Sequence, residues 1–280
     1  MKYSLLAVLL AFMLASCSTS SDGNKDYREE NEAEIASYVA NNNLNATQSA
    51  SGLYYVIEEE GTGKEINVTS DVTVSYKGYL TNGNEFDTTG DDFVSFNLQG
   101  VIPGFAEGLT YIKEGGKITL LIPAHLGYGS NDLNGIPGGS VLIFEVSALS
   151  PEQIAEKNDA DITEYLEKEG LNATKTDSGL YYIIETEGTG AQPSSDSNVT
   201  VAYTGYFLNG TKFDESGASG VAFNLDEVIE GWKEGITYFK VGGNGKLIIP
   251  AHLAYGSYNY STIPGGSVLI FDIDLKSINE

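Results

Sequence analysis

The sequence repeats itself with an offset of 127 residues. The nonapeptide IPGGSVLIF occupies residues 136–144 and returns unchanged at residues 263–271. When residues 44–150 are aligned with residues 171–277 without a gap, about 60 of the 107 positions are identical. This offset is too long for the unit of a solenoid and has the length of a whole domain. The chain is therefore predicted to hold two copies of one domain, at 44–150 and 171–280.

Each copy combines strands with one short helix. Apolar and polar residues alternate over residues 72–76, as in a half-buried strand. Residues 118–122 and 140–146 are nearly continuous apolar runs, which are typical of central, covered strands. In residues 104–113 and 231–240, large apolar side chains recur at i, i+4 and i+7, which predicts a short amphipathic helix. One such helix against a largely antiparallel sheet makes each copy an α+β domain.

A further helix is predicted to precede each copy. Before the second copy, Ser150 and Pro151 supply an N-cap and a proline at the first helical position, and Gly170 supplies a stop. We therefore expect a tether and helix over residues 17–43 and a connecting helix over residues 151–170. Because the helical pattern recurs with the domain, each helix is assigned to the domain that follows it. The alternative is a helical spacer.

The first residues have the layout of a secretory leader. Lys2 precedes an apolar run over residues 5–14, which is too short to span a bilayer as a helix. The sequence LASC at residues 14–17 resembles the box of bacterial lipoproteins, whose cysteine carries the lipid. We expect a signal peptide over residues 1–16 and lipidation of Cys17, which would anchor the protein to a membrane of the bacterial cell envelope, on the periplasmic or outer-membrane face. The alternative is an ordinary cleaved leader.

The composition argues against several classes of function. With 15 basic and 39 acidic residues the formal net charge is −24, so nucleic acid is not an expected partner. Cys17 is the only cysteine, which rules out an internal disulfide. The only histidines, His125 and His252, fall at equivalent positions of the two copies, and one per domain cannot build a usual zinc site. No hydrolase, phosphate-binding or dinucleotide motif occurs, so we expect no metal and no cofactor.

Each copy instead carries a set of aromatic and aliphatic residues with one aspartate. The first set comprises Tyr76, Phe86, Asp87, Phe96, Val101, Ile102, Phe105, Tyr128, Ile136 and Phe144. The second comprises Tyr203, Phe213, Asp214, Phe223, Val228, Ile229, Trp232, Tyr255, Ile263 and Phe271. These sets are either core residues or the lining of two pockets. A pocket is favoured because an aspartate directly after a strand phenylalanine places a charge at the edge of the apolar layer, which costs free energy unless it is paired.

Four stretches of the second copy, in this order, resemble the FK506-binding-protein family of peptidyl-prolyl cis–trans isomerases. They are VAYTGYFLNGTKFDES, VAFNLDEVIEGWKEG, LIIPAHLAYG and IPGGSVLIFDI, and each has a counterpart in the first copy. The resemblance covers most of residues 53–149 and 180–276. It implies two tandem domains, each with a curved, five-stranded antiparallel sheet wrapped over one short helix, and with a prolyl pocket between sheet and helix.

The resemblance also implies a role for each member of the two sets. Phe105 and Trp232 would form the pocket floors. The walls would be Tyr76, Phe86, Phe96, Val101, Ile136 and Phe144 in the first copy and Tyr203, Phe213, Phe223, Val228, Ile263 and Phe271 in the second. The catalytic groups would be the backbone amides of Ile102 and Ile229 and the hydroxyls of Tyr128 and Tyr255, which bind substrate carbonyls, with Asp87 and Asp214 at the rim near the twisting imide.

The sequence departs from the family pattern beside the aspartates. Family members commonly place an arginine between the Phe-Asp pair and the next phenylalanine, but residues 88–95 and 215–222 contain no basic residue. We therefore expect Asp87 and Asp214 to be held by tyrosine hydroxyls, such as those of Tyr76 and Tyr203. The divergent loops SNDLNG and SYNYST, just before the two nonapeptides, are expected to overhang the pockets.

The function implied is that of a lipid-anchored peptidyl-prolyl isomerase that helps exported proteins to fold. Its expected partners are proline-containing polypeptides, and macrolides of the FK506 type are candidate ligands. One alternative is a non-catalytic chaperone or scaffold that holds apolar segments in the same pockets. A second alternative is an adhesive surface lipoprotein with no relation to proline.

Overall fold

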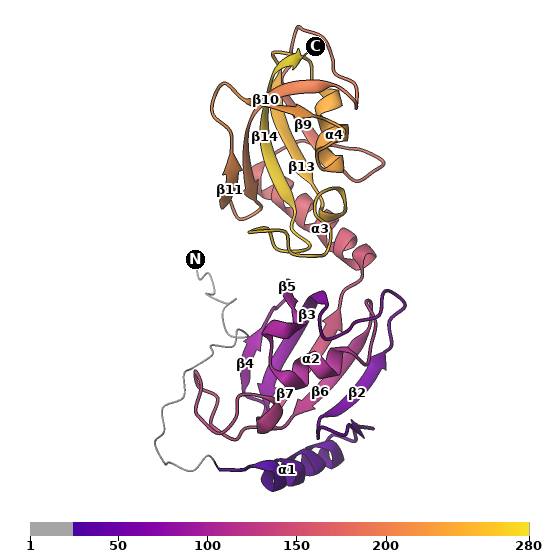
Figure 1. The fold of residues 1–280 in the computed structure, drawn as a ribbon, viewed down its shortest axis with the longest axis vertical. Helices are drawn as coiled ribbons and strands as arrows, with labels where there is room; N and C mark the ends of the chain where they lie inside the picture. Colours follow the sequence, from indigo (N-terminus) through magenta and orange to yellow (C-terminus); the bar gives the residue numbers. More distant parts are fainter. Residues whose placement is uncertain (1–24, 280) are drawn as a thin grey trace. The chain divides into compact units, whose positions relative to one another are not determined.

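The computed structural model describes residues 25–279, and these residues form two compact units. The boundary between the units falls between Ser150 and Pro151. Figure 1 shows the first unit from indigo to magenta and the second from pink to yellow, each with its own sheet. The signal peptide expected at residues 1–16 and the lipidation site Cys17 lie outside the described residues.

The first unit is a seven-stranded antiparallel sheet with one short helix packed on it. The strand order is β1-β2-β6-β7-β3-β4, and β5 pairs with the other end of β3. The elements are α1 (Arg28–Asn41), β1 (Thr47–Gln48), β2 (Tyr54–Glu59), β3 (Asp71–Leu80), β4 (Glu85–Thr88), β5 (Val94–Asn97), α2 (Pro103–Leu109), β6 (Lys117–Ile122) and β7 (Leu142–Ala148), with 3-10 turns η1 (Leu98–Gly100) and η2 (Ala124–Leu126).

The second unit repeats this topology in the order β11-β10-β14-β13-β9-β8, with β12 paired to β10. The elements are α3 (Pro151–Glu169), β8 (Thr174–Lys175), β9 (Tyr181–Thr186), β10 (Asn198–Phe207), β11 (Lys212–Glu215), β12 (Val221–Asn224), α4 (Glu230–Gly235), η3 (Ile236–Tyr238), β13 (Asn244–Ile249), η4 (Ala251–Leu253) and β14 (Leu269–Asn279). The prediction of two α+β domains, each a sheet over one short helix, is confirmed.

Three details differ from the expectation. Each sheet has seven strands rather than five: β4 and β5 pair separately with β3, as do β11 and β12 with β10, and a two-residue strand lies at the edge. The helix expected over 104–113 ends at Leu109, where the Thr110 hydroxyl donates a hydrogen bond to the Glu107 carbonyl at 2.6 Å. The strand expected from Ser140 begins at Leu142, because the Ser140 hydroxyl donates to the Pro137 carbonyl at 2.6 Å and holds Ser140 in the turn.

The short helix and the sheet enclose the main core of each unit. Phe105 and Leu109 of α2 are fully buried among Leu120, Phe144 and their neighbours. The helix approaches β6 closely: a Cβ on Gly108 would lie 2.3 Å from Leu120 Cδ2, so a larger residue there would force Leu120 to shift. The equivalent core of the second unit contains Trp232, Ile236 and Phe271.

The helices α1 and α3 cover the other face of their own sheets. Ile35 of α1 packs with Leu121 and Ile143, whose neighbours Leu120 and Phe144 belong to the main core. Since successive strand residues point to opposite faces, α1 lies on the face away from α2. Ile162 of α3 packs in the same way with Ile248, Val268 and Ile270. Among the described residues no helix is both long and apolar enough to cross a membrane.

Candidate functional site

A cavity of about 520 Å³ opens between α4 and the sheet of the second unit. All ten residues of the second set predicted from the sequence line it. They are Tyr203, Phe213, Asp214, Phe223, Val228, Ile229, Trp232, Tyr255, Ile263 and Phe271. Residues from β10, β11, β12, α4, the loop after η4 and β14 thus converge on one apolar hollow, as a small-molecule or peptide pocket requires.

Trp232 lies at the base of this cavity. It is 4% exposed, and its ring meets those of Tyr203, Phe223 and Phe271 edge to face, with centroids 5.1–5.2 Å apart. Such contacts fix the orientation of the indole, because aromatic pairs prefer edge-to-face geometry. The base of the pocket is therefore rigid and apolar.

The wall opposite the helix depends on a glycine in β10. A Cβ on Gly205 would lie 2.8 Å from the ring of Phe213 and 2.9 Å from that of Phe271. These two rings pack at 90° with centroids 5.6 Å apart. Gly78 has the same relation to Phe86 and Phe144 in the first unit. In both copies the lack of a side chain at this glycine leaves room for two phenylalanine rings of the wall.

The loop before α4 presents a backbone donor. Ile229 caps α4 in an extended conformation, and its carbonyl accepts hydrogen bonds from the Trp232 and Lys233 amides at 2.9 and 3.1 Å. No described residue accepts a hydrogen bond from the Ile229 amide N–H, and the same holds for Ile102 before α2. The Ile229 N–H at the second cavity is therefore available to a ligand carbonyl, and the Ile102 N–H occupies the equivalent position in the first unit.

The aspartates are held as expected from the missing arginines. The Tyr203 hydroxyl donates to Asp214 Oδ2 at 2.7 Å, and the Tyr76 hydroxyl donates to Asp87 Oδ2 at 2.6 Å. Within residues 25–279, neither aspartate forms an ion pair with a lysine, arginine or histidine. Burial, followed by the hydrogen bond to the aspartate, raises the pKa of Tyr76 and of Tyr203. Both hydroxyls are therefore protonated donors at neutral pH.

The remaining hydroxyls of the two sets are protonated as well. Burial, and then the charge of Asp87, raises the pKa of Tyr128 to about 12. Burial, and then the neighbouring Tyr260 and Asp214, raises the pKa of Tyr255. A phenol in this state donates a hydrogen bond and does not act as a base.

The first unit assembles its set in the same way. The Phe105 ring is edge to face with those of Phe96 and Phe144, with centroids 5.8 and 5.2 Å apart, and the Phe86 ring meets Phe144 at 5.4 Å. The aliphatic members and the remaining tyrosines belong to the same apolar cluster; they are Val101, Ile102, Ile136, Tyr76 and Tyr128. Every residue predicted for the first site is thus brought together there.

Comparison with known proteins decides the family. A family model described as "FKBP-type peptidyl-prolyl cis-trans isomerase" matches residues 63–149 and again residues 190–276. The chain belongs to this family. The resemblance inferred from the sequence is therefore confirmed, and the two units are tandem FKBP domains.

Several curated relatives carry the name FkpA. The "FKBP-type peptidyl-prolyl cis-trans isomerase FkpA" of Buchnera aphidicola subsp. Schizaphis graminum is 47% identical over 111 residues, which cover 39% of this chain and 44% of the relative. The FkpA of Escherichia coli K12 is 46% identical over 114 residues, covering 40% and 42%. A crystal structure of FkpA from Escherichia coli aligns with a TM-score of 0.40 at 41% identity over 44% of this chain and 60% of that one. Each of these two sequence matches spans less than half of the curated relative.

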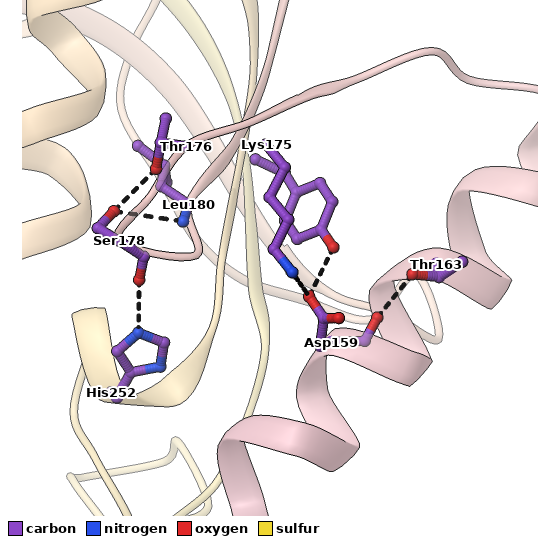
Figure 2. A network of polar contacts seen from close by, with 8 residues as sticks. Asp159, Thr163, Lys175, Thr176, Ser178, Leu180 and His252 are labelled. Carbon is purple, nitrogen blue, oxygen red and sulfur yellow. Dashed lines mark hydrogen bonds and ion pairs between the residues drawn. The ribbon is translucent and has the colours of Figure 1, made fainter. Parts of the chain in front are cut away.

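Both histidines of the FKBP domains have a structural hydrogen bond outside the predicted sets. His252 Nε2 donates to the Ser178 carbonyl at 2.8 Å (Figure 2), and His125 Nε2 donates to the Ser51 carbonyl at 3.0 Å. Neither histidine lines the cavity described above. Within residues 25–279 no group of three or more His, Cys, Asp or Glu is placed to hold a metal ion.

Four residues of the second pocket were not among those predicted. Glu227, Tyr260, Ser261 and Thr262 also line the cavity. The Tyr260 ring is stacked on that of Tyr255, with centroids 4.3 Å apart and an interplanar angle of 7°. The sequence did indicate that the loop SYNYST overhangs the pocket, and this loop supplies three of the four. No sequence pattern predicts Glu227 as a lining residue, because the pattern in this stretch consists of the apolar residues that follow it.

Proposed function

We propose that the protein is a peptidyl-prolyl cis–trans isomerase whose two FKBP domains each bind an X-Pro segment. The observation that carries this proposal is the ring-lined cavity of about 520 Å³ over Trp232, which contains a free backbone donor and a protonated tyrosine hydroxyl. A proline ring fits an apolar hollow of this kind, and the two donors can hold substrate carbonyls on one side of the rotating bond.

This site suits the reaction, because rotation about an X-Pro bond needs no nucleophile or cofactor. The barrier of about 18–20 kcal/mol arises from loss of C–N resonance. The planar amide is more dipolar than the twisted one, so an apolar surrounding disfavours the ground state relative to the transition state. Rings and a few fixed donors are therefore sufficient.

Each polar group then has a specific task. The amides of Ile102 and Ile229 and the hydroxyls of Tyr128 and Tyr255 hold substrate carbonyls and so fix the chain on one side of the rotating bond. Asp87 and Asp214 place a negative charge near the imide carbonyl, whose oxygen is most negative in the planar state. This charge opposes the planar amide more than the twisted one. Tyr76 and Tyr203 orient these carboxylates.

The activity is tested with residues 18–280 and a tetrapeptide containing Leu-Pro, in an assay without a coupling protease. We expect the isomerisation rate to rise in proportion to protein concentration and to fall in the Tyr128→Phe/Tyr255→Phe double variant. An FK506-type macrolide, a candidate ligand of the same pockets, should inhibit. Background rates with wild-type protein would reject the proposal.

The finer assignment is that the isomerase acts on exported proteins from a membrane anchor. The LASC box at residues 14–17 supports lipidation of Cys17, which would bring the two domains to the surface of the bacterial envelope. Several acyl chains hold a protein firmly, since each buried methylene contributes about 0.8 kcal/mol. Labelled fatty acid should be incorporated by the wild type and not by Cys17→Ser, which should also leave the membrane fraction.

The second candidate function is that of a non-catalytic chaperone or scaffold. It is favoured by one observation, the absence of a basic partner for Asp87 and Asp214 among the described residues. Under this alternative, suppression of client aggregation would survive in the Tyr128→Phe/Tyr255→Phe variant, and isomerisation by the wild type would stay at background.

A further inference from the structure

The helix before each FKBP domain contains a fully buried asparagine on its sheet-facing side. Asn31 of α1 and Asn158 of α3 are each 1% exposed, and they stand 127 residues apart like the rest of the repeat. A buried primary amide costs free energy unless its hydrogen bonds are made. The partners of these two side chains are the key to their role.

Each asparagine bridges the same two backbone groups of its own domain. The Asn158 Nδ2 donates to the Gly266 carbonyl at 2.9 Å, and the Ala251 amide donates to Asn158 Oδ1 at 2.8 Å. The corresponding bonds of Asn31, to the Gly139 carbonyl and from the Ala124 amide, are both 2.8 Å. The same geometry thus recurs in both domains.

The two bridged groups are the ends of the segment that closes the pocket. We define the flap as residues 251–266 in the second domain and residues 124–139 in the first. The second flap supplies five cavity-lining residues, namely Tyr255, Tyr260, Ser261, Thr262 and Ile263. The Gly266 amide also donates to the Gly256 carbonyl at 2.8 Å, which closes the flap on itself. The asparagine, which lies outside the flap, thus bonds to the first and the last residue of the flap.

The helix that presents Asn158 is itself fixed to the sheet. Ile162 packs with Ile248 and Ile270. Next to Asn158, Asp159 forms an ion pair with Lys175 (Figure 2). Asp159 also accepts a hydrogen bond from the Tyr181 hydroxyl at 2.6 Å. The helix is therefore a fixed reference from which a side chain can set the position of a loop.

We propose that Asn31 and Asn158 are positioning residues that set the flap over the pocket and thereby place the hydroxyls of Tyr128 and Tyr255. This inference rests on the proposed function, since the flap matters only if the pocket binds a ligand. A donor displaced by a few tenths of an ångström loses much of its effect on a bound carbonyl, so a site of this kind needs a supporting shell. The helices at 28–41 and 151–169 are thus parts of the ligand-binding domains.

The experiment uses the full chain, because Trp232 is its only tryptophan and reports on the second pocket alone. The probe is a tetrapeptide containing Leu-Pro, titrated by tryptophan fluorescence at 25 °C. In Asn158→Leu, which keeps the branching and the number of side-chain heavy atoms and removes both hydrogen bonds, we expect the affinity to fall by about three- to tenfold. Asn31→Leu is the matched control: it makes the same change in the domain without tryptophan and should leave this titration as in the wild type.

A purely structural role predicts a different result. In that case Asn158→Leu lowers the melting temperature, but the folded protein binds the probe with wild-type affinity, and this outcome overturns the proposal. If Asn158→Leu does not fold, Asn158→Asp serves instead, because it keeps the bond from the Ala251 amide and loses the donor to Gly266. It should weaken binding and speed hydrogen exchange in residues 251–266 relative to β13, and unchanged values of both would overturn the proposal.

Failure of the proposed function gives a separate signature. If the wild type binds the probe without accelerating isomerisation, the isomerase is rejected and the role of Asn158 is still decided by affinity. If the wild type binds no proline peptide at all, the pocket assignment itself fails, and the positioning proposal fails with it.

Discussion

The two predicted sites share their central aromatic residues but differ at positions along the rim and the flap. Phe105 and Trp232 occupy equivalent bases, and the wall phenylalanines are the same in both domains. On the rim, Gly100 in the first domain stands where Glu227 lines the second cavity. In the flap, Leu133 stands where Tyr260 stacks on Tyr255. We therefore expect the two sites to differ in the peptides they prefer, if both bind proline segments as proposed.

The backbone of the flap is preserved where its side chains differ. Leu133 and Ile136 exchange hydrogen bonds of 2.9 and 2.8 Å between their amides and carbonyls, and Tyr260 and Ile263 exchange two bonds of 2.9 Å. The same short turn thus carries an aliphatic side chain in one domain and an exposed ring in the other. A loop fixed at its backbone can change what it presents without moving the pocket wall.

Truncation of the aromatic residue at the bottom of either site should have the largest effect on stability and activity. Made in one domain only, it should remove the similarity of the two sites. Trp232→Ala leaves a cavity beneath three rings, so we expect the free energy of unfolding of the second domain to fall by about 3–5 kcal/mol. Phe105→Ala should do the same in the first domain. Calorimetry checks the unfolding, and the proline-peptide assay checks the activity. Trp232→Phe, which makes the two bases alike, is the control and should keep the activity; full turnover in a folded Phe105→Ala/Trp232→Ala variant would contradict the pocket assignment.

Loss of the Tyr128 or Tyr255 hydroxyl should have a smaller effect on the isomerisation rate. This change tests whether both sites are catalytically active. Tyr255→Phe keeps the ring and removes one donor, so kcat/KM for the second pocket should fall by about three- to tenfold. Tyr128→Phe should have the same effect in the first. Because burial holds the pKa of Tyr128 at about 12, its hydroxyl remains a donor throughout pH 5–9, and its contribution should be constant over that range. If only one of the two variants lowers the rate, the other pocket serves binding alone.

Exchange of the rim residues should alter selectivity more than rate. Glu227 and Asp214 are the charged residues lining the second cavity, and both are negative. We expect the Trp232 titration to favour a Lys-Pro over a Glu-Pro peptide, and Glu227→Gly to reduce that ratio by about two- to fivefold, with less effect at high salt. Glu230→Gln, which alters an exposed carboxylate outside the cavity lining, is the matched control. Equal reductions in both variants would assign the preference to the overall charge of the protein.

The smallest expected effect is on stability, and it concerns how α1 and α3 are attached to their sheets. Asp159 pairs with Lys175 in the second domain, whereas the equivalent residues of the first, Glu32 and Gln48, can form no ion pair. This pair is about half exposed, so Lys175→Gln should cost about 0.5 kcal/mol or less of the free energy of unfolding.

The pH dependence of this small difference has a defined sign. The hydrogen bond from Lys175, and then that from Tyr181, holds the pKa of Asp159 below its usual range. The contribution of the pair is therefore complete above the unfolded-state pKa of an aspartate and is lost as the pH falls through the lower folded-state value. Urea unfolding of wild type and Lys175→Gln at pH 7 and at pH 3 checks this. A difference that grows on acidification would contradict it.

Much of this arrangement could be predicted from the sequence because it depends on local patterns. The alternation at Val72–Tyr76 and the i, i+4, i+7 spacing at Phe105 are read within a few residues, and the 127-residue offset then gives each prediction a second copy. The lack of a basic residue near Asp87 was enough to indicate a tyrosine partner, since a carboxylate at the edge of an apolar layer must be paired.

The residues that escaped prediction act over long distances in the chain. The two partners of Asn158 lie 93 and 108 residues away in the sequence. The one sequence signal for Asn158 is that the equivalent position of the first copy is also an asparagine, Asn31. The apolar periodicity that predicts this helix carries no information on a buried amide. Glu227 reaches the cavity because of the path of the rim, which tertiary contacts determine.

The position of the boundary at Pro151 has a consequence for how such a protein could arise and be divided. Clear identity between the copies begins at residues 44 and 171, but the contacts place each preceding helix with the sheet it covers. A gene segment that started at residue 171 would encode a sheet without α3. Ile248, Val268 and Ile270 would then be exposed to solvent, and the flap would lack its hydrogen bonds to Asn158. The structural domain, with its preceding helix, is therefore longer than the region in which the two copies are clearly similar in sequence.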